Sequence, residues 1–317
     1  MDPTPFLRGN AFPAVRGAAY PRAKQDPRLP ADTWAQARIP VGVRLELLGS
    51  EVEIAYRTAT DDLGYRGDGA GRTFAVWRGG EQVDEEKAEL GEGRVELRLG
   101  DGADRAIVYF PEGMLPEILE VNGEVEPAPP QPLWVVYGDS VAEGWIASGP
   151  AMAWPAVAGR DRGLDVVNMG YAGAARGEMA SAEHVAELRA DVITVAYGTN
   201  CWVRTPHSVG AMREGIAAFL EMARTKHPET PIVVTSPIVR PDAEGAPNPL
   251  GATLEHLREA LEESVRERIA AGDLELELLP GRHLVHESQL GDGIHPNDDG
   301  HRALAEAIGA AVAARLA

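Results

Sequence analysis

The chain has 317 residues, of which 44% are hydrophobic and 25% are charged, an ordinary globular composition. Its net charge of −19 argues against nucleic acid or an anionic membrane surface as the main partner, because phosphate binding needs a basic face. The single cysteine, Cys201, excludes an intrachain disulfide. We find no signal peptide and no apolar run of membrane-spanning length, so we expect a cytoplasmic protein.

The first part of the chain is predicted to form β-strands. Its segments alternate apolar and polar residues or are short and rich in β-formers, with Gly, Asp and Asn between them. These segments are residues 43–59, 72–80, 94–100 and 105–113. Short strands with frequent turns favour a β-sandwich, which we assign to residues 1–126. Residues 127–132 contain four prolines, and this composition predicts a stiff linker outside any sheet or helix.

Residues 133–317 follow a different pattern, in which apolar runs alternate with helical periodicity. The apolar runs are residues 133–137, 164–170, 191–198, 231–236 and 274–279. Helical spacing is clearest from Leu254 to Ile269, and residues 211–227 and 301–317 behave in the same way. Such alternation predicts βαβ units, a buried parallel sheet and helices on both of its faces.

Polar residues stand where these strands end, and ligands bind at the carboxyl ends of strands in open parallel sheets. Ser140 follows the first strand and is the candidate nucleophile. A serine hydroxyl needs a neighbouring base, which His295 can supply, and Asp292 can orient that imidazole from three residues earlier. Taken alone, Gly-Asp-Ser is equally compatible with a turn or a helix cap. The chain order of Ser140, Gly173, Asn200 and Asp292-x-x-His295 favours acyl-transfer chemistry.

An acyl-transfer site also needs hydrogen-bond donors for the oxyanion of its tetrahedral intermediate. The candidates are the backbone N–H groups of Ser140 and Gly173 and the side-chain amide of Asn200. Cys201 is a rival nucleophile, although a packed and unreactive thiol is the simpler interpretation. The His283–His286 pair suggests a metal ligand spacing, but no third ligand is evident, and we predict no metal site.

Together these motifs resemble the four signature blocks of the SGNH/GDSL hydrolases across residues 133–317. The segments "NMGYAGAARGE" and "DGIHPNDDGH" are similar to the corresponding sequences of the subgroup that has an N-terminal β-sandwich. The resemblance implies a flavodoxin-like three-layer α/β/α catalytic domain preceded by an all-β, jelly-roll-like sandwich. It also implies ester hydrolysis or acyl transfer without a metal or other cofactor. The third block departs from the family pattern, because Asn200 is followed by Cys201 where the family commonly has Asp.

Several further side chains are candidate substrate contacts. Trp145, Trp154 and Trp202 fall in segments expected to border the pocket, where indoles stack on sugar rings or simply pack. Asp139 and Glu178 are also candidates, although Asp139 can instead hold the turn and Glu178 can be a solvated carboxylate.

Three functions remain open at this stage. The first is a serine esterase that cleaves short acyl groups, above all acetyl, from a carbohydrate or glycoside. The second is an acyltransferase that uses the same triad to pass the acyl group to an alcohol such as a natural product. The third is a non-catalytic binding protein, which the full set of catalytic residue types argues against. The expected partner is a small-molecule or carbohydrate ester.

Overall fold

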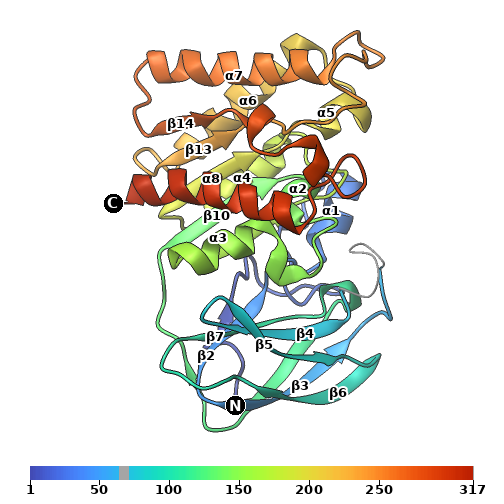
Figure 1. Ribbon diagram of the computed structural model, residues 1–317. Coiled ribbons are helices and arrows are strands. Elements are labelled where there is room, and N and C mark those ends of the chain that lie inside the picture. Colours follow the sequence, from blue (N-terminus) through green and yellow to red (C-terminus); the bar gives the residue numbers. More distant parts are fainter. Residues whose placement is uncertain (64–70, 317) are drawn as a thin grey trace.

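The computed structural model describes residues 1–63 and 71–316, and two differently built halves are visible in it (Figure 1). Antiparallel strands from the first part of the chain form the lower half of the view. A parallel sheet covered by helices forms the upper half, and the chain ends there at the helix drawn in red. The predicted combination of a β-sandwich and an α/β domain is therefore confirmed.

The parallel sheet has five strands in the order β11-β10-β12-β13-β14. Numbered along this half of the chain, that order is 2-1-3-4-5, the flavodoxin-like arrangement that the family resemblance implied. The strands are β10 (Leu133–Gly138), β11 (Asp165–Gly170), β12 (Val192–Ala196), β13 (Ile232–Thr235) and β14 (Leu276–Leu279). Each of the five predicted apolar runs overlaps one of these strands. The strand order reverses between β10 and β12, which places a binding crevice at their carboxyl ends.

Helices cover both faces of this sheet, because successive side chains of a strand point to opposite sides. Trp134 and Val136 of β10 join the hydrophobic cluster of α3 (Trp154–Arg162) and α8 (Asp298–Leu316). Val135 and Tyr137 join the cluster on the other face. That face is covered by α4 (Met179–Glu187), α6 (Val209–Arg224) and α7 (Leu254–Ala270). Helices α6, α7 and α8 were predicted, although the last predicted residue, Ala317, lies outside the described residues.

The antiparallel half is built from two sheets that share one hydrophobic core. One sheet has the order β1-β2-β7-β4-β5, with β9 paired to β2, and the other has the order β6-β3-β8. The first contains β1 (Leu7–Arg8), β2 (Arg44–Leu48), β7 (Ala106–Tyr109), β4 (Thr73–Arg78), β5 (Glu81–Lys87) and β9 (Glu126–Pro127). The second contains β6 (Gly91–Arg98), β3 (Glu51–Thr58) and β8 (Glu117–Asn122).

Part of the segment between β1 and β2 packs against the α/β half, whereas residues 1–126 were predicted to form the sandwich; Tyr20 of the same segment does lie in the sandwich core. Phe12, Leu29 and Ala37 belong to the same hydrophobic cluster as the parallel strands. This segment contains the helix α1 (Ala31–Ala37), drawn in blue close to the label of α2 in Figure 1. The predicted linker also begins later than expected, because Pro127 pairs with Leu47 at the edge of β2.

Short helices occupy several connections. They are α2 (Ser140–Glu143), α5 (Asn200–Val203) and the 3-10 turns at Glu112–Met114, Pro150–Met152, Gly281–His283 and Glu287–Gln289. Within residues 1–63 and 71–316, none of the helices combines the length and the apolar character needed to cross a bilayer.

Candidate active site

Ser140 lies at the first position of α2, directly after β10 has ended at Gly138. The turn between them is tight: a Cβ on Gly138 would lie 2.5 Å from the Ala142 Cβ and 2.6 Å from the Ala196 carbonyl oxygen. Asp139 caps the helix, since its Oδ1 accepts a 3.0 Å hydrogen bond from the Val141 N–H. The Gly-Asp-Ser sequence thus forms the strand-to-helix turn at the carboxyl end of the sheet.

Three side chains, Ser140, His295 and Asp292, form a chain of short contacts beside this turn. Ser140 Oγ lies 2.9 Å from His295 Nε2. His295 Nδ1 lies 2.7 Å from Asp292 Oδ2 on the opposite side of the ring. This arrangement requires the neutral imidazole to carry its proton on Nδ1, which leaves Nε2 free to accept the serine proton.

The loop before α8 brings Asp292 back onto His295. Asp292 Oδ1 accepts hydrogen bonds from the N–H groups of Ile294 at 2.9 Å and His295 at 2.7 Å, as in an Asx turn. Burial raises the pKa of Asp292, but the hydrogen bonds from the His295 side chain and from these two N–H groups outweigh it and hold the pKa below its usual value. Asp292 is therefore a carboxylate at neutral pH.

The segments that carry the candidate oxyanion donors contact the Ser140 turn, since Asp139 interacts with the backbone of Gly198 and Thr199 and Glu143 accepts a hydrogen bond from the Ala172 N–H. Among the described residues, the backbone N–H groups of Ser140 and Gly173 have no protein acceptor. Gly173 has a φ of 68°, a backbone conformation that L side chains rarely adopt. Asn200 begins α5, and its Nδ2 donates to the Ala175 carbonyl at 3.2 Å. This contact orients the Asn200 amide without the acidic neighbour that the family pattern commonly supplies.

Asn168, which the sequence analysis did not single out, ties α2 to the end of β11. Its Nδ2 donates to the Ala142 carbonyl at 2.8 Å, and its Oδ1 accepts from the Gly170 N–H at 2.8 Å. A Cβ on Gly170 would lie 2.5 Å from the Glu143 nitrogen, so the two segments touch through backbone. The serine helix and the loop that carries Gly173 are thereby held together.

A second missed contact crosses from the N-terminal segment. Arg22 and Glu143 are both completely buried, and Arg22 Nη2 lies 3.4 Å from Glu143 Oε2. The same carboxylate oxygen accepts a 2.9 Å hydrogen bond from the Ala172 N–H, next to Gly173. Arg22 also donates to the Gly170 and Ile39 carbonyls. No local pattern marks this pair, because the two residues are 121 positions apart.

Two titratable groups near the site have strongly shifted pKa values. Burial raises the pKa of Asp139 to about 6, although hydrogen bonding to the Val141 N–H and the charge of His295 oppose the shift. Cys201 is completely buried, and burial raises the pKa of its thiol far above the usual value. A thiol in this state is unreactive, which weighs against the rival cysteine nucleophile.

The tryptophans occupy different environments. The ring of Trp145 lies 6.1 Å from that of His295, centroid to centroid, and packs against Ile39 and Val41. Trp202 donates from Nε1 to the Ala246 carbonyl at 2.8 Å and lies under the Arg240 guanidinium. Trp154 is 1% exposed and packs against the similarly buried Trp134, which is the packing role that the sequence left open for it. Trp145 is thus the tryptophan that lies against the candidate base.

Glu178 is enclosed, which differs from the solvated carboxylate that the sequence suggested. Its Oε2 accepts from the Tyr137 hydroxyl at 2.8 Å, and its Oε1 accepts from Thr33 Oγ1 at 3.1 Å. The Arg176 side chain lies 3.3 Å from Oε1 as well. These contacts link α1 to the loop before α4 and occupy both oxygens.

The sequence profile of the GDSL-like Lipase/Acylhydrolase family matches residues 136–303. This range contains Ser140, Gly173, Asn200, Asp292 and His295 and covers just over half of the chain. A comparison with curated protein sequences finds no match.

Solved structures resemble the whole chain. Salicylyl-acyltransferase SsfX3 from a tetracycline biosynthetic pathway is similar with a TM-score of 0.81 and 22% identity, over 95% of this chain and 92% of that one. A putative GDSL-like lipase from Bacteroides ovatus has a TM-score of 0.79 and 20% identity, over 98% of this chain and 95% of the lipase. A family two carbohydrate esterase from Clostridium thermocellum in complex with cellohexaose has a TM-score of 0.66 and 16% identity, over 86% of this chain and 92% of the esterase. The likeness extends over both halves of the fold.

Proposed function

Because the chain belongs to the GDSL-like lipase/acylhydrolase family, we propose that Ser140, His295 and Asp292 are the triad with which it cleaves short acyl esters of a carbohydrate or glycoside. The protein is a serine ester hydrolase of the SGNH type. The observation that carries the assignment of residues is the pair of contacts on His295, 2.9 Å to Ser140 and 2.7 Å to Asp292. Acetyl is the acyl group that we favour.

The first half of the reaction acylates the serine. Ser140 Oγ attacks the ester carbonyl carbon while His295 Nε2 takes the hydroxyl proton. Asp292 remains ionised and stabilises the imidazolium through Nδ1. The N–H groups of Ser140 and Gly173 and the Asn200 amide donate to the oxygen that gains negative charge. The intermediate collapses when the alcohol leaves with the proton from His295, and the acyl group stays on Ser140.

The second half returns the free enzyme. Water gives a proton to His295 and attacks the acyl-serine carbonyl, and the same donors hold the second oxyanion. Collapse releases the carboxylic acid and returns the proton to Ser140 Oγ. The chemistry needs no group beyond the side chains and backbone named above.

A carbohydrate alcohol is supported by two observations. One solved structure of similar fold is a carbohydrate esterase in complex with cellohexaose. In this chain, the Trp145 ring lies 6.1 Å from the His295 ring. An indole next to the base can stack on the ring of a sugar whose ester lies over Ser140.

An acyltransferase is the second candidate. Its support is the likeness to a salicylyl-acyltransferase across both halves of the chain, with a TM-score of 0.81. The acyl-serine is common to both reactions, which differ only in whether water or an alcohol attacks it. An acceptor bound beside Trp145 and exclusion of water from that position would favour transfer.

Product analysis separates the two candidates. The full chain is incubated with acetylated monosaccharides and oligosaccharides, each with and without an added alcohol, and the products are identified by mass spectrometry. Free acid as the main product in every mixture supports the esterase, and an acylated acceptor supports the transferase. Ser140→Ala abolishes either product. Undiminished turnover by that variant contradicts the proposed nucleophile.

A further inference from the structure

A cavity of about 390 Å³ lies between the β-sandwich and the parallel-sheet half. Residues of β2, β4 and β7 line one side, and residues of α3 and β11 line the other. Neither Ser140 nor His295 lines it. Its volume falls within the range of roughly 300–1,000 Å³ that is typical of small-molecule sites. The cavity is therefore large enough for a ligand and separate from the proposed ester-cleaving centre.

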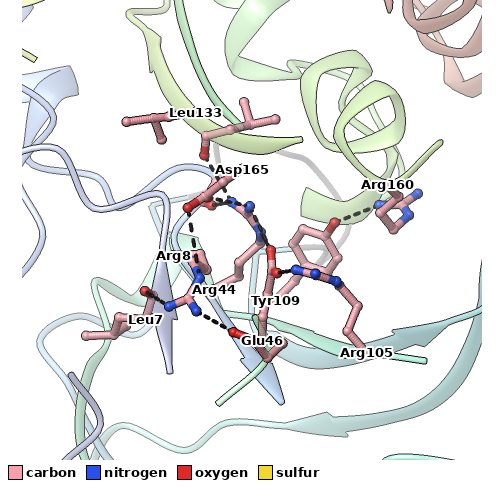
Figure 2. Close-up of polar contacts among 12 residues, drawn as sticks. Leu7, Arg8, Arg44, Glu46, Arg105, Tyr109, Leu133, Arg160 and Asp165 are labelled. Carbon is pink, nitrogen blue, oxygen red and sulfur yellow. Dashed lines mark hydrogen bonds and ion pairs between the residues drawn. The ribbon is translucent and has the colours of Figure 1, made fainter. Parts of the chain in front are cut away.

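Arginine side chains line this cavity, and two of them are neutralised there. Arg44 lies 2.9 Å from Glu46 Oε1, and Arg105 contacts the other oxygen of the same carboxylate. Arg44 also lies 2.9 Å from Asp165. Figure 2 shows Arg44 and Arg105 pointing toward Glu46 from different sides. This network connects the two halves of the protein, and within it Glu46 and Asp165 offset the charges of Arg44 and Arg105.

The other two arginines, Arg160 and Arg78, have no carboxylate within ion-pair distance among the described residues. The Arg160 guanidinium lies 4.3 Å from the centre of the Trp77 ring and donates to the Tyr109 hydroxyl at 2.8 Å (Figure 2). Arg78 is only 7% exposed and donates to backbone carbonyls, one of them that of Gly49 at 2.9 Å. These two positive charges are met only by neutral acceptors.

The wall formed by these residues is also rich in donors. The Trp77 Nε1, Arg78 Nε and Arg160 Nε groups are buried and have no acceptor among the described residues. Buried polar groups usually have a hydrogen-bond partner, so donors left without one are unusual. The other two lining carboxylates, Asp104 and Asp161, are exposed, and solvent weakens their effect on the inner cations.

We propose that this cavity is a second binding site, for a small organic anion in which a carboxylate or phosphate is joined to a sugar-sized body. The anionic group pairs with the Arg160 guanidinium, which suits planar carboxylates and phosphates. Trp77 and the lining apolar residues contact the body of the ligand. The net charge of the chain is −19, so the protein as a whole repels anions, and binding at this site would depend on the local arginines. The proposal goes beyond ester cleavage and does not depend on it.

A ligand in this position contacts both halves of the protein. Arg78 and Trp77 belong to β4 of the sandwich, whereas Arg160 belongs to α3. A ligand that binds only the folded state raises the free energy of unfolding. The increase grows with the logarithm of the ratio of ligand concentration to Kd. Binding should therefore be visible both as heat and as an increase in Tm.

The test is isothermal titration of the full chain with glucuronate, glucose 6-phosphate and glucose. We expect saturable binding of at least one of the two anions and weaker binding of glucose; the tighter anion shows whether carboxylate or phosphate is preferred. Arg160→Met should weaken that binding at least about tenfold, the effect of losing one charge-assisted hydrogen bond. Arg162→Met removes the same charge from an exposed position of α3 outside the cavity and should leave Kd unchanged.

Two further variants separate this site from the ester-cleaving centre. Ala156 is half-buried in the cavity wall, and Ala156→Phe should fill the cavity and weaken binding without removing a charge. Ser140→Ala should bind the anion as the wild type does, whether or not the proposed catalytic function holds. If the cavity variants do not fold, a crystal structure of the wild type with the tighter anion decides: density in the cavity supports the proposal, and density elsewhere overturns it. Absence of saturable anion binding, or equal losses from Arg160→Met and Arg162→Met, also overturns it.

Discussion

Arg22 Nη2 lies 3.4 Å from Glu143 Oε2, and neither side chain is exposed to solvent. The contact joins the segment before α1 to the helix that begins with Ser140. Because Glu143 also accepts from the Ala172 N–H at 2.9 Å, the pair holds the loop that carries Gly173. A segment from the N-terminal part of the chain thus supports the candidate oxyanion donors.

Arg22→Met should lower both stability and turnover. The substitution removes the Arg22 guanidinium from the buried Glu143 carboxylate, and breaking a buried ion pair in this way costs about 3–5 kcal/mol of folding free energy in comparable cases. Urea denaturation measures this loss. In the fraction that stays folded, kcat should fall more than KM changes, because the loop carries Gly173, a proposed donor to the transition-state oxygen.

A control variant and a rescue variant test whether the Arg22–Glu143 pair is responsible for these effects. Arg28→Met removes an exposed arginine whose partners are Asp26 and Glu183, and it should change stability far less because solvent screens these pairs. Adding Glu143→Gln to Arg22→Met removes the carboxylate charge that Arg22 no longer faces and should restore part of the lost stability. Equal effects of Arg22→Met and Arg28→Met would show that the buried pair does not support the fold.

Asn200→Ala should reduce kcat by about 10²- to 10³-fold, the usual effect of removing one oxyanion donor. The fold should persist, as judged by an unchanged circular dichroism spectrum, because the lost contact is a single 3.2 Å hydrogen bond to the Ala175 carbonyl. The neighbouring Cys201→Ala is the control and should keep its activity, since the buried thiol takes no part in the reaction. A wild-type rate for Asn200→Ala removes Asn200 from the proposed oxyanion hole.

Asp292→Asn should lower kcat by a factor on the order of 10²–10⁴, because the amide cannot stabilise the imidazolium and can favour the wrong tautomer. The amide oxygen can still accept from the Ile294 N–H, so the loop should keep its shape. Steady-state kinetics on a chromogenic short-chain ester measures the effect. A loss of less than about tenfold indicates a Ser140–His295 dyad in which Asp292 has only a structural role.

Asp139→Asn should stabilise the protein at neutral pH. Burial raises the folded-state pKa of Asp139 to about 6, from an ordinary value of 3.8. Between these values the folded state binds the proton and the unfolded state does not, so the wild type loses stability as the pH rises from about 4 to about 6. The difference corresponds to at most about 3 kcal/mol at pH 8. Asparagine avoids this cost and can still cap α2.

Urea denaturation of both proteins across this pH range measures the effect. The advantage of Asp139→Asn should shrink as the pH falls to about 4 and vanish below it, where Asp139 becomes protonated in the unfolded state as well as in the folded state. Asp139→Ala removes the same charge and also the cap to Val141, so it should be about 1 kcal/mol less stable than Asp139→Asn. An advantage that does not vary with pH contradicts the raised pKa.

The parallel sheet could be predicted from the sequence because four of its five strands, all except the edge strand β14, are buried on both faces. Such strands are nearly continuous apolar runs, as in residues 133–137 and 191–198, and they need no long-range information to be recognised. The candidate triad residues could also be identified from the sequence. Ser140 stands just after a predicted strand, and Asp292 and His295 are only three positions apart. The contacts between these two motifs were inferred from chain order and topology alone.

Other features lacked a local signal. Strand β5 is polar and largely exposed along its whole length, so its sequence has no hydrophobic alternation. Helix α3 contains proline, glycine and three charged residues within nine positions, which obscures its period. The contacts of Phe12, Leu29 and Arg22 with the parallel-sheet half depend on the path of the chain between β1 and β2. Their residue types alone do not indicate which half they join.

The central claim is that Ser140 carries the acyl group during turnover. The most direct measurement is rapid quenching of the enzyme with a short-chain acyl ester, followed by proteolysis and mass spectrometry of the peptides. We predict an acyl adduct on Ser140 that decays as product forms and is absent from Ser140→Ala, which should also be inactive. An adduct on another side chain during turnover, or full activity of Ser140→Ala, contradicts it.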